Sequence, residues 1–265
     1  MVAPALSALY DACVAAPASD APRIAFAAAL DARGDAWGAF VQTQLKLTAA
    51  LRANDDNKAL ELEAAANAQG RGHAREWANG LAEIASVVEF SRGLVESIVI
   101  DAATFVAHAD EIFQRAPIRY VVLKDVGDHL AAVLGLPHLA QLVWLSFGGD
   151  RTHPIGDSGM QKLAACGSLE NLRVLDITFQ SVTRRGLEAL CASPVLRSLV
   201  CVELAGNEFS SPIEEIDTDW ASGRDVAESL RLPELGQELE AKYGPLAWLH
   251  PVTRLAHRPP RFEEL

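Results

Sequence analysis

The hydrophobic residues in the middle of the chain recur with a fixed spacing. Three successive units have hydrophobic residues at their first, fourth, seventh and ninth positions: Leu139, Leu142, Leu145 and Phe147; Leu169, Leu172, Leu175 and Ile177; and Leu196, Leu199, Val202 and Leu204. In the first two units a stretch with helical spacing follows, opened by Gly159-Met160 and by Gly186-Leu187. Weaker copies begin at Arg92 and Arg115. The pattern predicts about five units, each consisting of one short strand, a turn and a helix.

The first part of the chain has a purely helical pattern. Its hydrophobic residues recur three and four positions apart, as on one face of an amphipathic helix. Helix starts are expected at Asp20-Ala21-Pro22 and after the polar turn 54–57, and a break is expected at 69–72. We therefore expect a helical N-terminal domain over residues 1–89, followed by the repeats over residues 90–211.

The last part of the chain loses the repeat. Residues 212–220 are acidic, a short helix is expected within Leu232–Tyr243, and the remainder is expected to be ordered coil. The end of a stack of repeats exposes a hydrophobic edge that needs a cover. We therefore expect residues 212–265 to form an irregular C-terminal cap.

Side chains alternate between the two faces of a strand, which divides the repeat residues into two sets. Repeat positions seven and nine are expected to face the core, so that positions six, eight and ten face the opposite, concave side of the sheet. The candidate partner-binding residues on that side are Tyr120, Val122, Lys124, Trp144, Ser146, Asp176, Thr178 and Glu203. The alternative is that the helical domain or the C-terminal cap covers the aromatic members of this set.

Two further expectations concern particular repeat positions. Asp176 and Glu203 share position eight of adjacent repeats, so their strands would place them roughly 5 Å apart, and we expect a solvated acidic patch. Position twelve is an asparagine only at Asn207, whereas Asp150 and Gln180 replace it in the other units. Irregular turns are therefore expected there.

Composition narrows the possible partners and the cellular location. The chain has 265 residues, half of them hydrophobic, and a net charge of −12. Such an acidic chain is a poor ligand for nucleic acid or for an anionic membrane. No apolar run is long enough to span a bilayer. The cysteines Cys13, Cys166, Cys191 and Cys201 form no CxxC pair, so we expect reduced thiols and a cytoplasmic protein.

Residues that carry chemistry are scattered rather than grouped. Cys201 occupies position six, where a thiol could meet a ligand, but no neighbouring base is implied to activate it. The spacing of His250, His257, Glu263 and Glu264 matches no zinc pattern. The glycines near 148–159 lack the lysine and hydroxyl residues of a phosphate-binding loop. We therefore expect no catalytic residues, no metal and no cofactor.

Two motifs extend the comparison beyond the repeat itself. The repeats have the leucine-rich repeat pattern. The run Asp20-Ala-Pro-Arg23…Phe26…Leu30…Gly34-Asp35…Gly38-Ala-Phe-Val41…Gln44 resembles a short helical "repeat-companion" domain that precedes leucine-rich repeats in certain bacterial proteins. Phe90-x-Arg-Gly-Leu-Val-Glu96 resembles the junction between that domain and the first repeat. The companion domain usually has Ala-Asp-Trp-Leu where this chain has Ala27-Ala-Ala-Leu30.

The resemblance implies an α/β fold with a short right-handed leucine-rich repeat solenoid behind a helical domain. It also implies a protein-interaction architecture without a shared catalytic role. The favoured function is a non-enzymatic scaffold, adaptor or immunity-type inhibitor that binds a protein partner on the concave sheet. An enzyme with a cleft between the helical domain and the solenoid is the first alternative. A self-assembling structural protein is the second.

Overall fold

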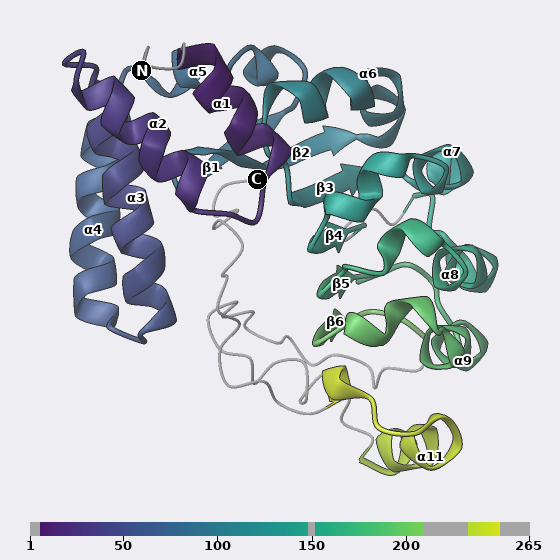
Figure 1. Ribbon diagram of the computed structural model, residues 1–265. Coiled ribbons are helices and arrows are strands. Elements are labelled where there is room, and N and C mark those ends of the chain that lie inside the picture. Colours follow the sequence, from purple (N-terminus) through teal and green to yellow (C-terminus); the bar gives the residue numbers. More distant parts are fainter. Residues whose placement is uncertain (1–5, 148–151, 209–232, 250–265) are drawn as a thin grey trace. The chain divides into compact units, whose positions relative to one another are not determined.

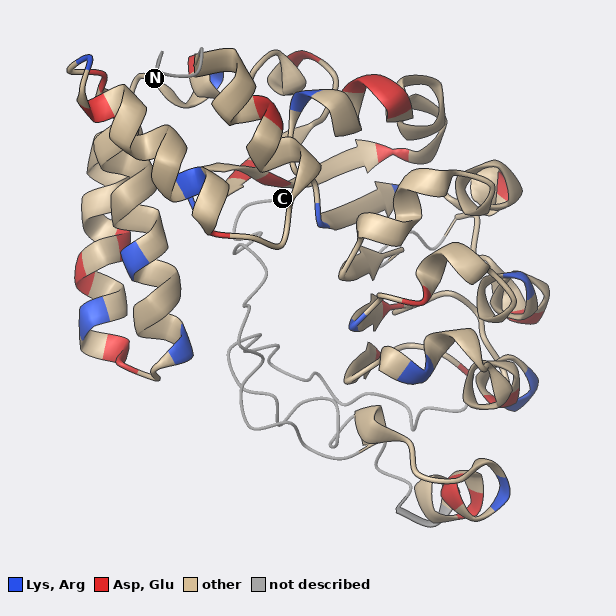
Figure 2. Ribbon diagram, viewed as in Figure 1, with Lys and Arg blue, Asp and Glu red and all other residues tan. Residues whose placement is uncertain are grey.

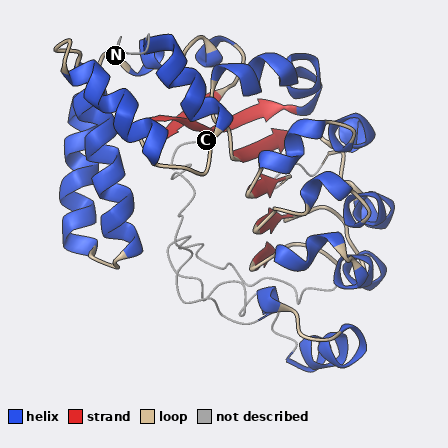
Figure 3. Ribbon diagram, in the orientation of Figure 1, coloured by secondary structure: helices blue, strands red, loops and turns tan. Residues whose placement is uncertain are grey.

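A computed structural model of the 265-residue chain describes residues 6–147, 152–208 and 233–249. The described residues form an α/β structure with ten α-helices and one six-stranded, mostly parallel sheet in the order β1-β2-β3-β4-β5-β6 (Figures 1 and 3). Two compact units can be distinguished, Met1–Ile98 with Asp110–Arg119, and Val99–Ala109 with Tyr120–Leu255.

The first unit begins with consecutive helices that pack one on the next. They are α1 (Leu6–Ala15), α2 (Ala21–Asp31), α3 (Ala36–Arg52), α4 (Asp56–Gly70) and α5 (Ala74–Trp77), followed by the short 3₁₀ helix η1 (Leu81–Glu83). The polar turn 54–57 starts α4 as expected, because Asp55 accepts a hydrogen bond from Lys58 N. Asp35 caps α3 in the same way by accepting from Trp37 N. The prediction that Asp20 caps α2 with its side chain is wrong, since its carboxylate binds Arg92 instead.

A β-hairpin follows these helices. Its strands are β1 (Val87–Ser91) and β2 (Leu94–Asp101), and helix α6 (Ala102–Arg115) follows directly. The two connecting residues, Arg92 and Gly93, both have positive φ, as a type I′ turn requires. A side chain on Gly93 would collide with Val41 of α3, so the turn lies directly against that helix. Leu94 completes a core cluster with Phe26 and Leu30 of α2.

The second unit alternates strands with helices. Its elements are β3 (Tyr120–Lys124), η2 (Gly127–His129), α7 (Leu130–Leu134), η3 (Pro137–Gln141), β4 (Trp144–Ser146), α8 (Gly156–Ala164), η4 (Gly167–Leu169), β5 (Val174–Asp176), α9 (Arg184–Ala192), η5 (Val195–Ser198), β6 (Cys201–Glu203), α11 (Pro233–Tyr243) and η6 (Ala247–Leu249). Strands β3 to β6 pair in parallel, with Leu145 opposite Val121 and Leu175, and Val202 opposite Leu175. Helices α7, α8 and α9 lie in a row beside them (Figure 1).

The inner face of these strands forms the hydrophobic core of the second unit. The residues at repeat positions seven and nine are at most 1% exposed: Val121, Leu123, Leu145, Phe147, Leu175, Ile177, Val202 and Leu204. The prediction that these positions face the core is therefore confirmed. Because strand side chains alternate, positions six and eight lie on the opposite face.

Buried side-chain amides order the loops that follow the strands. Asn207 Oδ1 accepts from Gln180 N and Val182 N, and its Nδ2 donates to Ile177 O and Leu204 O. Gln180 has an equivalent role one unit earlier, because its Nε2 donates to Phe147 O and its Oε1 accepts from Ile155 N. The backbone of this turn is nevertheless unusual, as expected, because the neighbours Phe179 and Ser181 both have positive φ; Asp150 lies outside the described residues.

Other polar side chains join adjacent strand–helix units. Asp157 Oδ1 accepts from the backbone N–H groups of Thr183 and Gly186, and its Oδ2 accepts from Thr183 Oγ1 at 2.6 Å. Ser193 Oγ donates to Ala164 O. These bonds fix each unit to the preceding one through groups that the strand pairing does not use.

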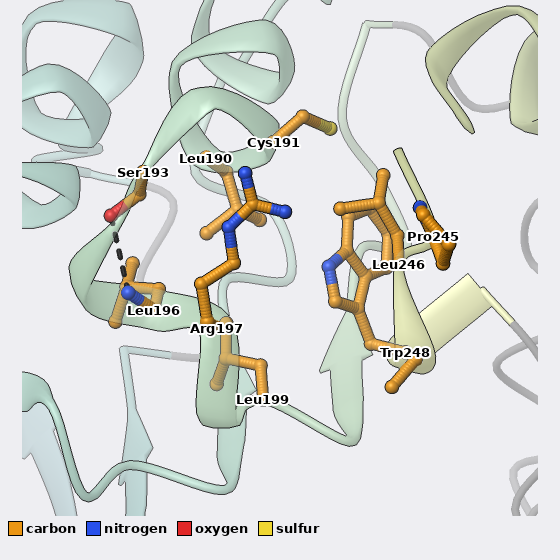
Figure 4. Close-up of a pocket in the computed structure, with 10 residues that line it drawn as sticks. Leu190, Cys191, Ser193, Leu196, Arg197, Leu199, Pro245, Leu246 and Trp248 are labelled. Atoms are coloured by element: carbon orange, nitrogen blue, oxygen red, sulfur yellow. Dashed lines mark hydrogen bonds between the residues drawn. The ribbon is translucent and has the colours of Figure 1, made fainter. Parts of the chain in front are cut away.

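After residue 232 the chain packs against the last unit. Helix α11 packs on α9, and the buried Trp248 of η6 lies close to Leu246, Arg197 and Cys191 (Figure 4). The space left between these side chains is a cavity of only about 20 Å³, which is room for about one water molecule. This region therefore packs against α9 and η5, and the cavity between them is too small for a larger ligand.

Candidate interaction surface on the parallel strands

Repeat position six forms a continuous packed column on the outer face of the sheet. Tyr120, Trp144, Val174 and Cys201 are register partners in adjacent strands, and they form one cluster with the half-buried Val143. Tyr120 and Trp144 are each only 4% exposed. The repeat spacing placed Tyr120 and Trp144 side by side, as observed, but both candidate binding residues are buried in this cluster and have a packing role.

A second row, at position eight, contains polar side chains. Ser146 lies opposite Asp176, and Ser146 Oγ donates to Asp176 Oδ2 at 2.7 Å. The other carboxylate oxygen, Oδ1, accepts from Thr178 N at 2.9 Å. Burial raises the pKa of Asp176, and these two hydrogen bonds act in the opposite direction.

Asp176 and Glu203 are register partners, as the repeat spacing predicted. The prediction that both belong to a solvated patch is wrong for Asp176, which is 3% exposed, whereas Glu203 is half-buried. The pair therefore consists of an inner carboxylate held by Ser146 and an outer one that is open to solvent.

The candidate partner-binding residues thus divide into two groups. Tyr120, Trp144, Ser146 and Asp176 are buried and form the base of the surface. The half-buried residues form its accessible border: Val122, Lys124, Thr178 and Glu203. We call these four residues the strand border. An approaching molecule would meet the strand border first.

The cysteine on this surface is not set up as a nucleophile. Burial raises the pKa of Cys201 to about 12, and the neighbouring carboxylates of Glu203 and Asp176 act in the same direction. A thiol with such a pKa is almost entirely protonated at neutral pH. Among the described residues no group of three or more His, Cys, Asp and Glu side chains could hold a metal ion. His250, His257, Glu263 and Glu264 lie outside the described residues.

One open hollow in the second unit is lined by helical residues rather than by strand residues. It occupies about 600 Å³ and is lined by residues of α7, α8 and η4, among them Leu134, Lys162 and Cys166. Cys166 Sγ donates to Leu134 O, and Lys162 is the only charged side chain of the lining. In this unit many of the charged side chains are carried by α8, α9 and α11 (Figure 2).

The first unit contains a group of buried charges that the sequence analysis did not identify as a cluster. Arg23 and Glu96 are fully buried and form an ion pair at 2.8 Å. Arg92 binds the same glutamate and also donates to Asp20 Oδ1 at 2.8 Å and to Pro17 O at 2.6 Å. All four residues belong to the two motifs that resemble the companion domain and its junction, so the structure brings the two motifs into direct contact.

Further contacts between these motifs surround the hairpin turn. Gln44 Oε1 accepts from Gly93 N at 3.0 Å, and Trp37 Nε1 donates to Gly93 O at 2.9 Å. The signal in the sequence was that each motif carries charged residues, Asp20 and Arg23 in one and Arg92 and Glu96 in the other. Their distance along the chain, about 70 residues between Asp20 and Arg92, concealed the contact.

The part of the chain that the structure describes has no helix long and apolar enough to cross a membrane. No protein-family model, no curated protein and no solved structure matches this chain.

Proposed function

We propose that residues 90–211 form a short right-handed leucine-rich repeat solenoid, and that residues 1–89 are a domain of the repeat-companion type. The parallel register of β3 to β6 supports the first part, together with the burial of the leucine positions and the amide-ordered loops. The contacts of Asp20 and Arg23 with Arg92 and Glu96 support the second part. They explain why the companion-domain motif and the junction motif would occur together, because the charged residues of one bind those of the other.

On this basis the protein is a non-enzymatic interaction module, a scaffold, adaptor or inhibitor, that binds a protein partner at the strand border. The observation that carries the proposal is the alignment of outward-facing positions along four parallel strands. A rigid row of this kind presents a fixed pattern of side chains, and binding sites of parallel sheets occur at the carboxyl ends of the strands. Lys124 and Glu203 are the last residues of β3 and β6, and Thr178 lies two residues after the end of β5.

The same proposal places the protein in the cytoplasm, without nucleic acid or membrane as partner. All four cysteines are free thiols, which suits a reducing compartment. The net charge of −12 opposes binding to polyanions.

The experiment is affinity capture from native lysate with charge-reversal variants of the strand border. We expect Lys124→Glu/Glu203→Lys to reduce recovery of a specific partner at least about tenfold, because charge complementarity at a contact surface selects the partner. The control is Lys58→Glu/Glu61→Lys on α4, which makes the same two charge changes at an exposed ion pair. Equal recovery with both double variants would contradict the proposal, as would the absence of a stoichiometric partner.

Alanine substitutions at Tyr120 and Trp144 are poor tests of the same idea. Both side chains are buried in the position-six column, so their removal would destabilise the sheet as well as any contact with a partner. The border residues avoid this ambiguity, and circular dichroism with thermal melting checks that their variants remain folded.

A further inference from the structure

The outer face of β3 to β6 is buried, although it lies opposite the core face of the sheet. Its side chains at positions six and eight include several that are at most 7% exposed: Tyr120, Trp144, Val174, Cys201, Ser146 and Asp176. Within the part of the chain that the structure describes, the position-six column packs with one further hydrophobic residue, Val143, which directly precedes β4. Neighbouring strands shield the flanks of an outward side chain but leave its tip open. We therefore infer that a further segment covers this face.

Polar groups on the same face lack complementary partners. Trp144 Nε1 is a buried donor without an acceptor. Asp176 accepts hydrogen bonds from the neutral groups Ser146 Oγ and Thr178 N, and among the described residues no cation pairs with it. Buried donors normally have an acceptor, and buried carboxylates are normally paired with a cation. The face thus offers a donor for a backbone carbonyl and a carboxylate for a basic side chain.

A basic part of the chain begins next to these strands. Helix η6 packs on β6, the last strand of the sheet, and residues 250–265 follow η6 directly. We call residues 250–265 the arginine segment. Up to Phe262 it contains Arg254, Arg258 and Arg261 and no acidic residue. At about 3.3 Å per extended residue and about 4.8 Å between strands, roughly five extended residues cross from β6 to β3. The segment is therefore long enough to cover the face.

Charge distinguishes this segment from the other long part of the chain outside the described residues. Residues 209–232 are predominantly acidic, with Glu214, Glu215, Asp217, Asp219, Asp225 and Glu228 against Arg224 and Arg231. Like charges beside Asp176 and Glu203 would repel each other, whereas the arginines of the arginine segment complement these carboxylates.

We propose that the arginine segment docks in extended form across the outer face of β3 to β6. Its arginines pair with Asp176 and Glu203, because a guanidinium forms strong charge-assisted hydrogen bonds with a carboxylate. One of its backbone carbonyls accepts from Trp144 Nε1. The docked segment covers the position-six column. The proposal concerns this chain alone and does not depend on the proposed function, since the segment docks with or without a protein partner.

The test follows the thiol of Cys201, which lies in the column that the segment covers. Full-length protein with Cys166→Ser, which removes the half-buried thiol, is alkylated with iodoacetamide, and mass spectrometry of its peptides gives the rate at each remaining cysteine. Arg254→Glu/Arg258→Glu/Arg261→Glu should increase the rate at Cys201 at least about tenfold, because release of the segment removes the cover from that thiol.

The matched control is Arg33→Glu/Arg71→Glu/Arg185→Glu in the same full-length background. It makes the same change in net charge at exposed arginines and should leave the rate at Cys201 as in the parent protein. Cys13 and Cys191 are buried outside the position-six column and serve as internal references for the stability of the fold. Their rates should be the same in both triple variants.

A synthetic peptide of residues 250–265, added to the arginine-segment variant, should restore the protection of Cys201 in a saturable manner. The same peptide with its three arginines replaced by glutamate should not. Equal rates at Cys201 in the two triple variants would overturn the proposal, because another part of the chain would then cover the face. Equal acceleration at Cys13, Cys191 and Cys201 without protection by the peptide would overturn it as well, because it reports a general loss of stability. If the arginine-segment variant does not fold, Glu203→Gln removes the opposite charge and should accelerate Cys201 selectively, and an unchanged rate there would contradict the proposal.

Discussion

Arg92 and Glu96 form a two-pronged ion pair, in which Arg92 Nε donates to Glu96 Oε1 at 2.9 Å and Arg92 Nη2 donates to Oε2 at 2.8 Å. Arg92 adopts a positive φ in the turn, and this places its side chain next to the strand residue four positions later. Both side chains are almost fully buried. The turn, the start of α2 and strand β2 are thereby held together by charge rather than by hydrophobic packing alone.

Glu96→Gln should strongly destabilise the protein. The amide keeps the size of the side chain but leaves Arg23 and Arg92 without their shared counter-charge in a buried place. Loss of one partner of a buried ion pair reduces the free energy of unfolding by about 3–5 kcal/mol. Urea denaturation followed by circular dichroism measures it. Glu61→Gln, at the exposed pair with Lys58, should change stability by less than about 1 kcal/mol. Similar losses in the two variants would show that the buried pair is not stabilising.

Glu89 should make stability depend on pH in the opposite sense to most carboxylates. Its Oε2 is buried without a partner among the described residues, and burial raises its pKa to about 7. Glu89 therefore binds its proton more tightly in the folded state than in the unfolded state. Its contribution to the free energy of unfolding declines as the pH rises from the unfolded pKa of Glu89 through about 7. Glu89→Gln should flatten that part of the stability–pH profile and increase the free energy of unfolding above pH 7. An unchanged profile would mean that Glu89 is solvated.

Asn207→Ala should destabilise the second unit. The substitution leaves Gln180 N, Val182 N, Ile177 O and Leu204 O buried without their side-chain partner. Each unsatisfied buried group costs about 1–3 kcal/mol, so the total should be on the order of 3 kcal/mol or more. The urea midpoint gives the difference. Asn171→Ala removes one exposed hydrogen bond to Ala140 O and should have almost no effect. If both alanine variants melt alike, the loop is ordered by its backbone alone.

Thiol reactivity should separate the four cysteines. Burial raises the pKa of Cys13 to about 11 and that of Cys191 and Cys201 to about 12, whereas Cys166 is only half-buried. We expect Ellman's reagent to modify Cys166 first and slowly in the native protein, and all four thiols in guanidinium chloride. Cys166→Ser should abolish the early phase. Rapid modification of Cys201 would instead show that the position-six column opens in solution.

Local patterns in the sequence were enough to predict the helices and the inner residues of the strands. Only one strand register places Leu145 and Leu175 in the core, because a shift by one residue would turn every leucine to the other face of the sheet. The starts of α3 and α4 follow from Asp35 and Asp55, whose partners lie two and three residues away. In each case the interaction that decides the structure lies within the same element or the next repeat.

Exposure and long-range partners could not be predicted in the same way. Asp20 looked like a helix cap, but Arg92 reaches it from 72 residues away. Trp144 and Asp176 occupy outward positions of their strands, yet their exposure depends on the side chains that neighbouring strands place beside them. A repeat spacing defines the direction of a side chain, and it contains no information about the depth at which that side chain lies.

The length of the Gln180 side chain determines which backbone groups its amide contacts. One additional methylene lets its amide donate to O of Phe147, the residue that follows β4, while the backbone N–H of Gln180 donates to Asn207 Oδ1. Hydrogen bonds between a side-chain amide and the backbone thereby join each loop to the next. Repeat position twelve can therefore be either asparagine or glutamine, and a search for related sequences that requires asparagine there would miss chains with glutamine.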